Sequence, residues 1–143
     1  MSKNHLPKSM TCIAIREPGG PEVLVATSAP VPSPGEGEIL VKVIAAGVNR
    51  GRYPPPKGAT EIPGLEIAGE VVEIGRGIRR WKLGDKVMAL VVGGGYAEYC
   101  LAFEDHARLH RLDGAATRVF EQRGCRGELS QLFQVLDRRE HER

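Results

Sequence analysis

The sequence has few aromatic residues, almost no net charge and no long apolar run. Aromatic residues make up 5% of the 143 residues, and the formal net charge is +2. A nucleic-acid-binding surface needs a basic patch or stacking aromatic rings, so this composition argues against a nucleic-acid partner. No stretch reaches the ~18 consecutive apolar residues of a membrane span. The sequence therefore predicts neither a nucleic-acid partner nor a membrane partner.

Cysteine is also scarce, and its spacing fits no known framework. The three cysteines are Cys12, Cys100 and Cys125, and no C-x-x-C pair occurs. This pattern argues against a disulfide scaffold and a structural zinc site. We expect each cysteine to be a small buried hydrophobic residue in a reducing, cytoplasmic setting. His106 and His110 would suit a metal only on a helix, and since strand or loop is expected there, no metal site is predicted.

Several nucleotide and catalytic motifs are missing from the sequence. No G-x-G-x-x-G, G-x-x-x-x-G-K-[ST], H-E-x-x-H or G-x-S-x-G occurs. Gly93, Gly94 and Gly95 come nearest to a dinucleotide fingerprint, but Tyr96 and Glu98 follow them, so the pattern is not met. These glycines are expected to form a tight turn between two strands.

Proline and glycine divide the chain into three parts. Residues 1–10 lack an apolar segment and are expected to be an N-terminal extension rather than a secretory signal. Residues 11–103 hold nine of the ten prolines and 15 of the 18 glycines, whereas residues 104–143 hold no proline, no lysine and eight arginines. The middle part is typical of short strands separated by turns, and the last part of a divergent tail. One domain, 11–103, is therefore expected.

Alternating apolar residues between turns predict a mainly β fold. Gly69 interrupts one alternating run, which indicates a bulge or a close backbone contact. A series of short strands with turns between them is typical of a barrel or sandwich. The expected strands are 12–17, 22–30, 38–46, 66–75, 85–92 and 95–102.

Two further segments stand out, one in the middle of the chain and one near its end. The three prolines Pro54 to Pro56 follow Tyr53 and force an extended course, so a loop is expected after Asn49. Loops on a β scaffold are where functional side chains usually lie. In the tail, an amphipathic helix is predicted from Leu129, Leu132, Phe133 and Leu136.

Several segments between Cys12 and Ala102 together resemble one known family. They are REPGGPEVL, PSPGEGEILVKVIAAGVNR, GRYPPPKGATEIPGLEIAGEVVEIG and WKLGDKVMALVVGGGYAEYCLA. In this order they are similar to the N-terminal, GroES-like domain of the medium-chain dehydrogenases/reductases, above all the zinc-free quinone oxidoreductases. The resemblance implies a GroES-like, partly open β-barrel with short helices, in addition to the C-terminal helix predicted above.

The resemblance also implies a chemistry. NADPH would deliver hydride to a quinone or an activated alkene, and donors would stabilise the charge on the substrate oxygen. Asn49 and Tyr53 match the positions of family active-site residues. Zinc-dependent relatives place a Cys ligand at the position of Asn49 and a His ligand at that of Leu65. Neither an amide nor an isobutyl side chain replaces these ligands, so hydride transfer without metal is implied.

The sequence departs from the family in two places. Relatives carry roughly two more helical turns between Asn49 and Tyr53, which affects the assignment of both residues. Their NADPH-binding domain follows the barrel, and the 39 residues after Glu104 (143 minus 104) carry no dinucleotide fingerprint. We therefore expect a truncated quinone oxidoreductase that is inactive alone.

Two alternatives stay open: a non-catalytic remnant that binds a partner protein, and a chaperonin-like GroES module. Neither is excluded by the sequence, although the matched segments are those of the reductases. The sequence also leaves open whether the chain forms a homo-oligomer.

Overall fold

The computed structural model describes residues 6–48 and 61–109. Asn49, Tyr53, Cys125 and the helix predicted in the tail lie outside these residues. The described residues are mainly β, and their only helices are two 3-10 turns, η1 (Pro21–Val23) and η2 (Glu104–His106). Among them, no helix has the length and apolar character to cross a membrane.

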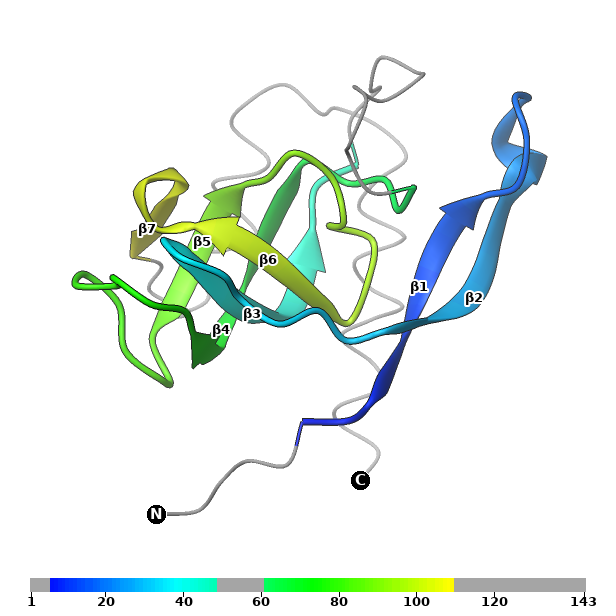
Figure 1. The fold of residues 1–143 in the computed structure, drawn as a ribbon. Helices are drawn as coiled ribbons and strands as arrows, with labels where there is room; N and C mark the ends of the chain where they lie inside the picture. Colours follow the sequence, from blue (N-terminus) through cyan, green and yellow to red (C-terminus); the bar gives the residue numbers. More distant parts are fainter. Residues whose placement is uncertain (1–5, 49–60, 110–143) are drawn as a thin grey trace, which may run out of the picture. The chain divides into compact units, whose positions relative to one another are not determined.

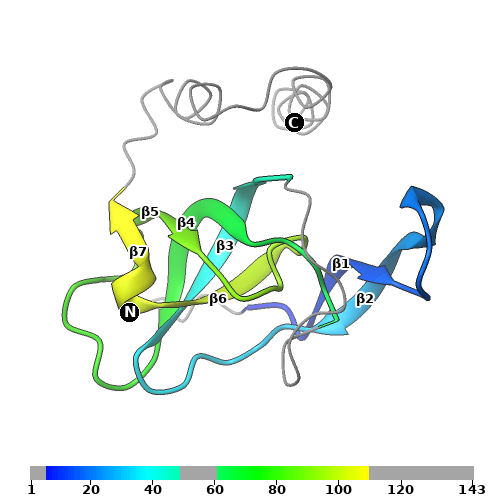
Figure 2. The same cartoon turned by 90° about the horizontal axis from the view of Figure 1, so that it is seen from above.

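Within the described residues, seven strands form two sheets (Figure 1). A hairpin pairs β1 (Ser9–Ile15) with β2 (Leu24–Pro30). A five-stranded antiparallel sheet has the order β6-β3-β4-β5-β7. It curls into a partly open barrel, as Figure 2 shows from above, so the predicted fold class is confirmed. The strands of this sheet are β3 (Glu38–Ala46), β4 (Glu66–Ile74), β5 (Lys86–Leu90), β6 (Tyr99–Phe103) and β7 (Ala107–Leu109).

All six expected strands are present, with shifted ends. The first begins at Ser9, inside the segment expected to be an extension, and Met10 is buried in it. The last expected strand begins at Tyr99 rather than at residue 95. The strand β7 was not expected, and its Ala107 is fully buried against β5. The sheet therefore continues beyond residue 103.

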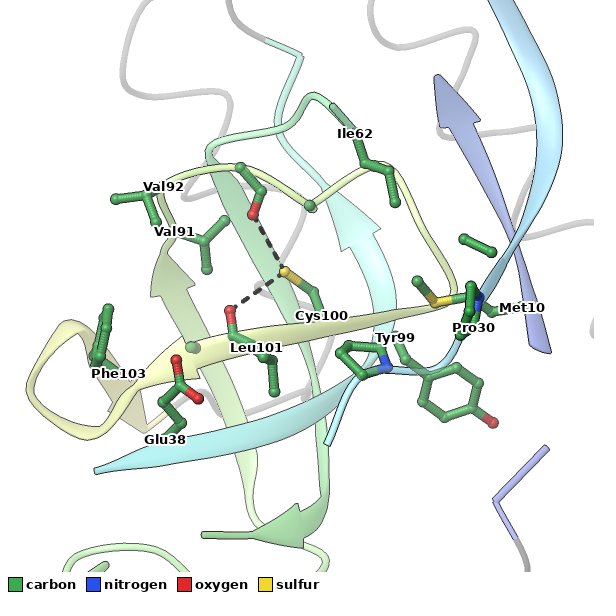
Figure 3. A pocket seen from close by; sticks show the side chains of 15 residues that line it. Met10, Pro30, Glu38, Ile62, Val91, Val92, Tyr99, Cys100, Leu101 and Phe103 are labelled. Atoms are coloured by element: carbon green, nitrogen blue, oxygen red, sulfur yellow. Dashed lines mark hydrogen bonds between the residues drawn. The ribbon is translucent and has the colours of Figure 1, made fainter. Parts of the chain in front are cut away.

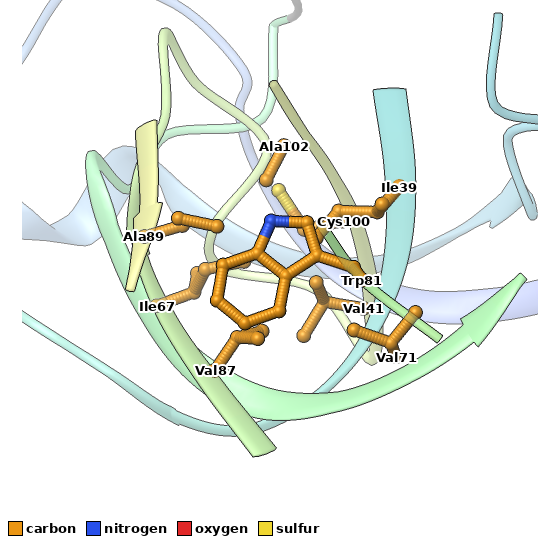
Figure 4. Close-up of a cluster of buried hydrophobic side chains, with 10 residues drawn as sticks. Ile39, Val41, Ile67, Val71, Trp81, Val87, Ala89, Cys100 and Ala102 are labelled. Atoms are coloured by element: carbon orange, nitrogen blue, oxygen red, sulfur yellow. The ribbon is translucent and has the colours of Figure 1, made fainter. Parts of the chain in front are cut away.

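The core fills the inside of the curled sheet (Figure 4). Apolar side chains that alternate along β3, β4, β5 and β6 point inward, and Trp81 enters from the loop between β4 and β5. The indole nitrogen of Trp81 donates a hydrogen bond to the carbonyl oxygen of Glu104 at 3.1 Å. The buried cluster consists of Ile39, Val41, Ile67, Val71, Trp81, Val87, Ala89, Cys100, Ala102 and Ala107.

Two bulges in the β3–β4 pair decide which side chains face this core. The register shifts between Leu40 and Val41 and again between Val43 and Ala45. At the second shift Ile44 is the extra residue, and it is 46% exposed. Because the bulge resets the alternation, Ala46 packs against the core.

Gly69 lies beside the second bulge and confirms the expected close contact. It pairs with Val43, and a Cβ atom on Gly69 would lie 2.0 Å from the carbonyl oxygen of Lys42. Real Cβ atoms do not approach a backbone oxygen so closely. Only glycine lets β3 and β4 meet at this distance.

The hairpin is joined to the sheet through the segment before β6. The amide of Ile13 donates to the carbonyl of Tyr96 at 2.8 Å, and the amide of Glu98 donates to the carbonyl of Thr11 at 3.1 Å. The Glu98 carboxylate also accepts from the amide of Thr11 at 2.7 Å. These bonds fix β1 against residues 96–98.

Glu104 ties the end of β6 to the loop that carries Trp81. Its carboxylate accepts hydrogen bonds from the backbone amides of Arg79 and Arg80, at 2.8 and 2.6 Å. These two amides, that of Arg80 first, lower the pKa of the Glu104 carboxyl. A lowered folded-state pKa means that the carboxylate stabilises the fold at neutral pH.

We expect Glu104→Gln to destabilise the protein at pH 7 and to lose this effect in acid. The contribution of Glu104 is complete above the unfolded carboxyl pKa of about 4.3 and disappears as the pH falls through the lower folded-state pKa. Urea unfolding of both proteins at pH 7, 4 and 3 measures it. A difference between them that stays constant with pH would contradict this role.

Candidate functional site

The two residues predicted to act on substrate, Asn49 and Tyr53, lie outside the described residues. The segments on both sides of them are described. The chain leaves β3 at Ala46, continues through Gly47 and Val48, and is described again from Glu61 to the start of β4. The candidate site is therefore defined by the strand ends that flank these positions.

The end of β3 lies against the start of β4. Ala46 pairs with Ile67, and the amide of Gly47 donates to the carbonyl of Glu66 at 2.9 Å. Leu65, one residue earlier, accepts a hydrogen bond from the amide of Val91 at 2.8 Å and is 44% exposed. The structure thus brings Gly47, two residues before Asn49, to the strand end that carries Leu65.

Tyr96 contacts both sides of this strand end, although no sequence pattern predicts a role for it. Its hydroxyl donates to the carbonyl of Gly47 at 3.3 Å, and its amide donates to the carbonyl of Pro63 at 2.9 Å. Gly64 makes room for the ring, because a Cβ atom there would lie 2.7 Å from Cδ1 of Tyr96. The sequence feature that could have pointed to Tyr96 is the isolated glycine Gly64. The two residues are 32 positions apart (96 minus 64), so local sequence does not connect them.

The glycines at residues 93–95 do not form a phosphate-binding turn. Gly93 and Gly94 have positive φ angles of 136° and 86°. The amide of Gly94 donates to Ile62 at 2.7 Å, and that of Gly95 donates to Gly64 at 3.1 Å. Since these amides are already bonded, they do not fit a dinucleotide phosphate. The expected tight turn is instead a longer connection that runs along residues 62–64.

The described cysteines do not have reactive thiols. Cys12 and Cys100 are free and buried, as expected of small hydrophobic residues. Burial raises the pKa of the Cys100 thiol to about 12, and it raises the pKa of Cys12 as well. Both thiols are therefore protonated at neutral pH, which makes them poor nucleophiles and metal ligands. Residues 6–48 and 61–109 hold no group of three metal-binding side chains.

A pocket of about 360 Å³ runs along β6 (Figure 3). Glu38 is the one charged residue in its lining, and Cys100 bonds weakly to the carbonyls of Gly93 and Leu101. The pocket lacks the converging polar groups of a catalytic site. Its lining consists of Met10, Ala29, Pro30, Pro32, Glu38, Ile62, Val91, Val92, Gly93, Gly94, Tyr99, Cys100, Leu101, Ala102 and Phe103.

The chain is similar to a family of dehydrogenase domains and to several quinone oxidoreductases. Residues 35–135 match the family model of the alcohol dehydrogenase GroES-like domain. A chloroplastic quinone-oxidoreductase of Triphysaria versicolor is 41% identical over 60% of this chain and 30% of its own length. The quinone oxidoreductase of Lama guanicoe is 40% identical over 73% of this chain and 34% of its own length.

The fold comparison agrees with the sequence comparison. A mycobacterial protein solved as a complex with NADPH has a TM-score of 0.63 and 35% identity, over 73% of this chain and 34% of that protein. The chain spans about a third of the length of the curated relatives named above. It belongs to the alcohol dehydrogenase GroES-like domain family and is similar there to the quinone oxidoreductases of the medium-chain dehydrogenase/reductase superfamily.

Proposed function

We propose that this barrel is the substrate-side domain of a cytoplasmic quinone oxidoreductase that uses NADPH and needs no zinc. One observation carries the proposal. The ends of β3 and β4 meet through the Gly47–Glu66 hydrogen bond, and the resemblance implies that the two zinc-ligand positions of zinc-dependent relatives, 49 and 65, adjoin these ends in sequence. The similarity to quinone oxidoreductases supports the substrate class, a quinone or an activated alkene.

The proposed chemistry needs hydrogen-bond donors rather than a nucleophile. NADPH, when bound, would supply a hydride, and the substrate oxygen would carry negative charge until a proton from solvent neutralises it. Asn49 would donate through its side-chain amide and Tyr53 through its phenol, which stabilises that charge in the transition state. The buried thiols of Cys12 and Cys100 take no part, since their raised pKa values keep them protonated.

Independence of zinc rests on the side chains at the two ligand positions. Leu65 is exposed at the strand end and has no metal-binding atom. The amide of Asn49 is a weak zinc ligand compared with a thiolate or an imidazole. A hydrogen-bonding site therefore suits these residues better than a metal site.

We expect a quinone to perturb Asn49 selectively. The chain contains two asparagines, Asn4 and Asn49, so selective 15N-asparagine labelling gives a small set of NMR signals with Asn4 as internal reference. Titration with a water-soluble benzoquinone should shift the side-chain signal of Asn49 and leave Asn4 in place. Tyr53→Phe should weaken the apparent affinity about tenfold, the upper range for loss of one hydrogen bond.

A matched control is available in Tyr99→Phe. No hydrogen bond of the Tyr99 hydroxyl is found among the described residues, so this variant should titrate like the wild type. If the quinone moves neither asparagine signal, the proposed substrate site is wrong. The alternative, a protein-binding module, would then gain support from the apolar pocket along β6.

We also expect the isolated chain to reduce quinones no faster than the uncatalysed background. The amides of Gly94 and Gly95, in the glycine run closest to a dinucleotide fingerprint, are engaged in backbone bonds and do not fit the NADPH phosphates. If the phosphates of NADPH are not bound, the nicotinamide carbon that donates the hydride is not kept close to the quinone. Loss of this positioning can raise the reaction barrier by several kcal/mol. NADPH fluorescence and a quinone-reduction assay measure both steps. Micromolar NADPH binding with turnover that Tyr53→Phe abolishes would refute this expectation.

A further inference from the structure

We infer that Tyr96 is a positioning residue for the substrate site. Its hydroxyl holds the end of β3, and the segment with Asn49 and Tyr53 begins directly after that end. The catalytic meaning of this inference rests on the proposed function. The positioning of the β3 end by Tyr96 does not depend on the proposed function, and it can be measured without any substrate.

The carbonyl of Gly47 is buried and accepts a hydrogen bond from the Tyr96 hydroxyl. Gly47 is buried, and its amide donates to Glu66 at 2.9 Å while its carbonyl accepts from Tyr96 at 3.3 Å. Both polar groups of the residue are therefore bonded to different parts of the chain. A buried carbonyl that loses its donor is costly, because water cannot easily replace the bond.

The backbone of Tyr96 is fixed independently of its hydroxyl. The amide bonds to Pro63 at 2.9 Å, and the carbonyl accepts from the amide of Ile13 in β1 at 2.8 Å. The ring occupies the space left by the missing side chain of Gly64. Because residues 63–64 and β1 hold Tyr96 in place, its phenol can act as a rigid support for the end of β3.

The consequence for catalysis would be precise placement of the donors. A misplacement of about 1 Å at a reacting centre can cost roughly 100-fold in rate. Asn49 follows Gly47 by two residues, so an error at Gly47 is passed on through a very short piece of chain. A hydroxyl that touches neither substrate nor cofactor can thus influence the donor at position 49.

The test compares Tyr96→Phe with Tyr99→Phe in the full 143-residue chain. Tyr96→Phe keeps the ring against Gly64 and removes the hydroxyl alone. We expect its 15N-asparagine spectrum to show displaced Asn49 signals and unchanged Asn4 signals. The Gly47 amide keeps its own bond to Glu66, but it should exchange with solvent about three- to tenfold faster, because losing the bond at the Gly47 carbonyl lowers the free energy of local opening by that of one ordinary hydrogen bond. Tyr99→Phe should change neither measurement.

The outcomes separate this inference from the proposed function. Unchanged Asn49 signals and unchanged Gly47 exchange in Tyr96→Phe would overturn the inference. Displaced Asn49 signals without a quinone response in the wild type would support the positioning and refute the proposed substrate. A thermal midpoint equal to that of Tyr99→Phe shows that the change at Asn49 is local, and a Tyr96→Phe midpoint lower by many degrees would assign the residue to general stability instead.

Discussion

Gly69→Ala is expected to destabilise the barrel by about 3 kcal/mol or more. The added Cβ would lie 2.0 Å from the carbonyl oxygen of Lys42 and 2.9 Å from a methyl group of Val41. The closest atom is backbone in the adjacent strand, so no side chain can rotate to relieve the clash. The β3 and β4 strands would have to separate at the centre of the sheet.

Urea unfolding followed by the fluorescence of Trp81 measures this effect, because Trp81 is the only tryptophan and is buried in the core. Gly35→Ala is the matched control. A Cβ atom on Gly35 would approach the flexible end of Glu38, at 3.1 Å, and no backbone atom of another strand. Equal unfolding midpoints for the two variants would show that the contact at Gly69 does not hold the sheet together.

Trp81→Ala is expected to cost about 3–5 kcal/mol of stability, the usual range for removing a large aromatic side chain from a core. The ring lies among inward-facing side chains of β3, β4, β5 and β6 (Figure 4). Its removal would leave a cavity at the centre of the curled sheet. It would also remove the donor to the Glu104 carbonyl, which anchors the β4–β5 loop.

Far-UV circular dichroism during urea unfolding is the appropriate measurement, since this variant has no tryptophan fluorescence. Trp81→Phe should lower the free energy of unfolding less than Trp81→Ala does, because it keeps an aromatic ring in the core. It should still cost some stability, because the hydrogen bond to Glu104 is lost. Leu83→Ala, in the same loop and 62% exposed, should change stability by no more than about 0.5 kcal/mol. A Trp81→Ala variant as stable as Leu83→Ala would mean that the ring is not part of the core.

The sequence predicts the long strands well because their side chains alternate between two environments. In β3 and β4 the inner residues are apolar over nine residues each, which gives a clear period of two. The bulge at Ile44 is not visible in that pattern, since Ile44 and Ala46 are both apolar. Only the pairing with β4 shows which of them faces the core.

The strand β7 and the start of β6 escape prediction for a different reason. Three residues are too few to show a period, and β7 forms because β5 offers it a partner. Residues 95–98 belong to the expected strand 95–102, but the segment from Gly94 to Tyr96 bonds to residues 62–64. Tertiary contacts there replace the expected strand.

The candidate site is predictable in part. The resemblance places Asn49 and Tyr53, which remain predictions, and it points to Leu65. It gives no indication of Tyr96, because the hydrogen bond to Gly47 joins residues 49 positions apart. Local pattern cannot reveal such a pair, and the vacant space at Gly64 becomes meaningful only once the ring of Tyr96 is seen in it.

The exposure of Leu65 has an evolutionary consequence. The side chain stands at a strand end outside the core cluster, while the backbone bond between Gly47 and Glu66 holds that end whatever the side chain at position 65. Surface substitutions away from special features usually change stability by no more than about 0.5 kcal/mol. A lineage can therefore change the side chain at position 65 without rebuilding its scaffold. In this sense stability and reactivity in the barrel can evolve separately.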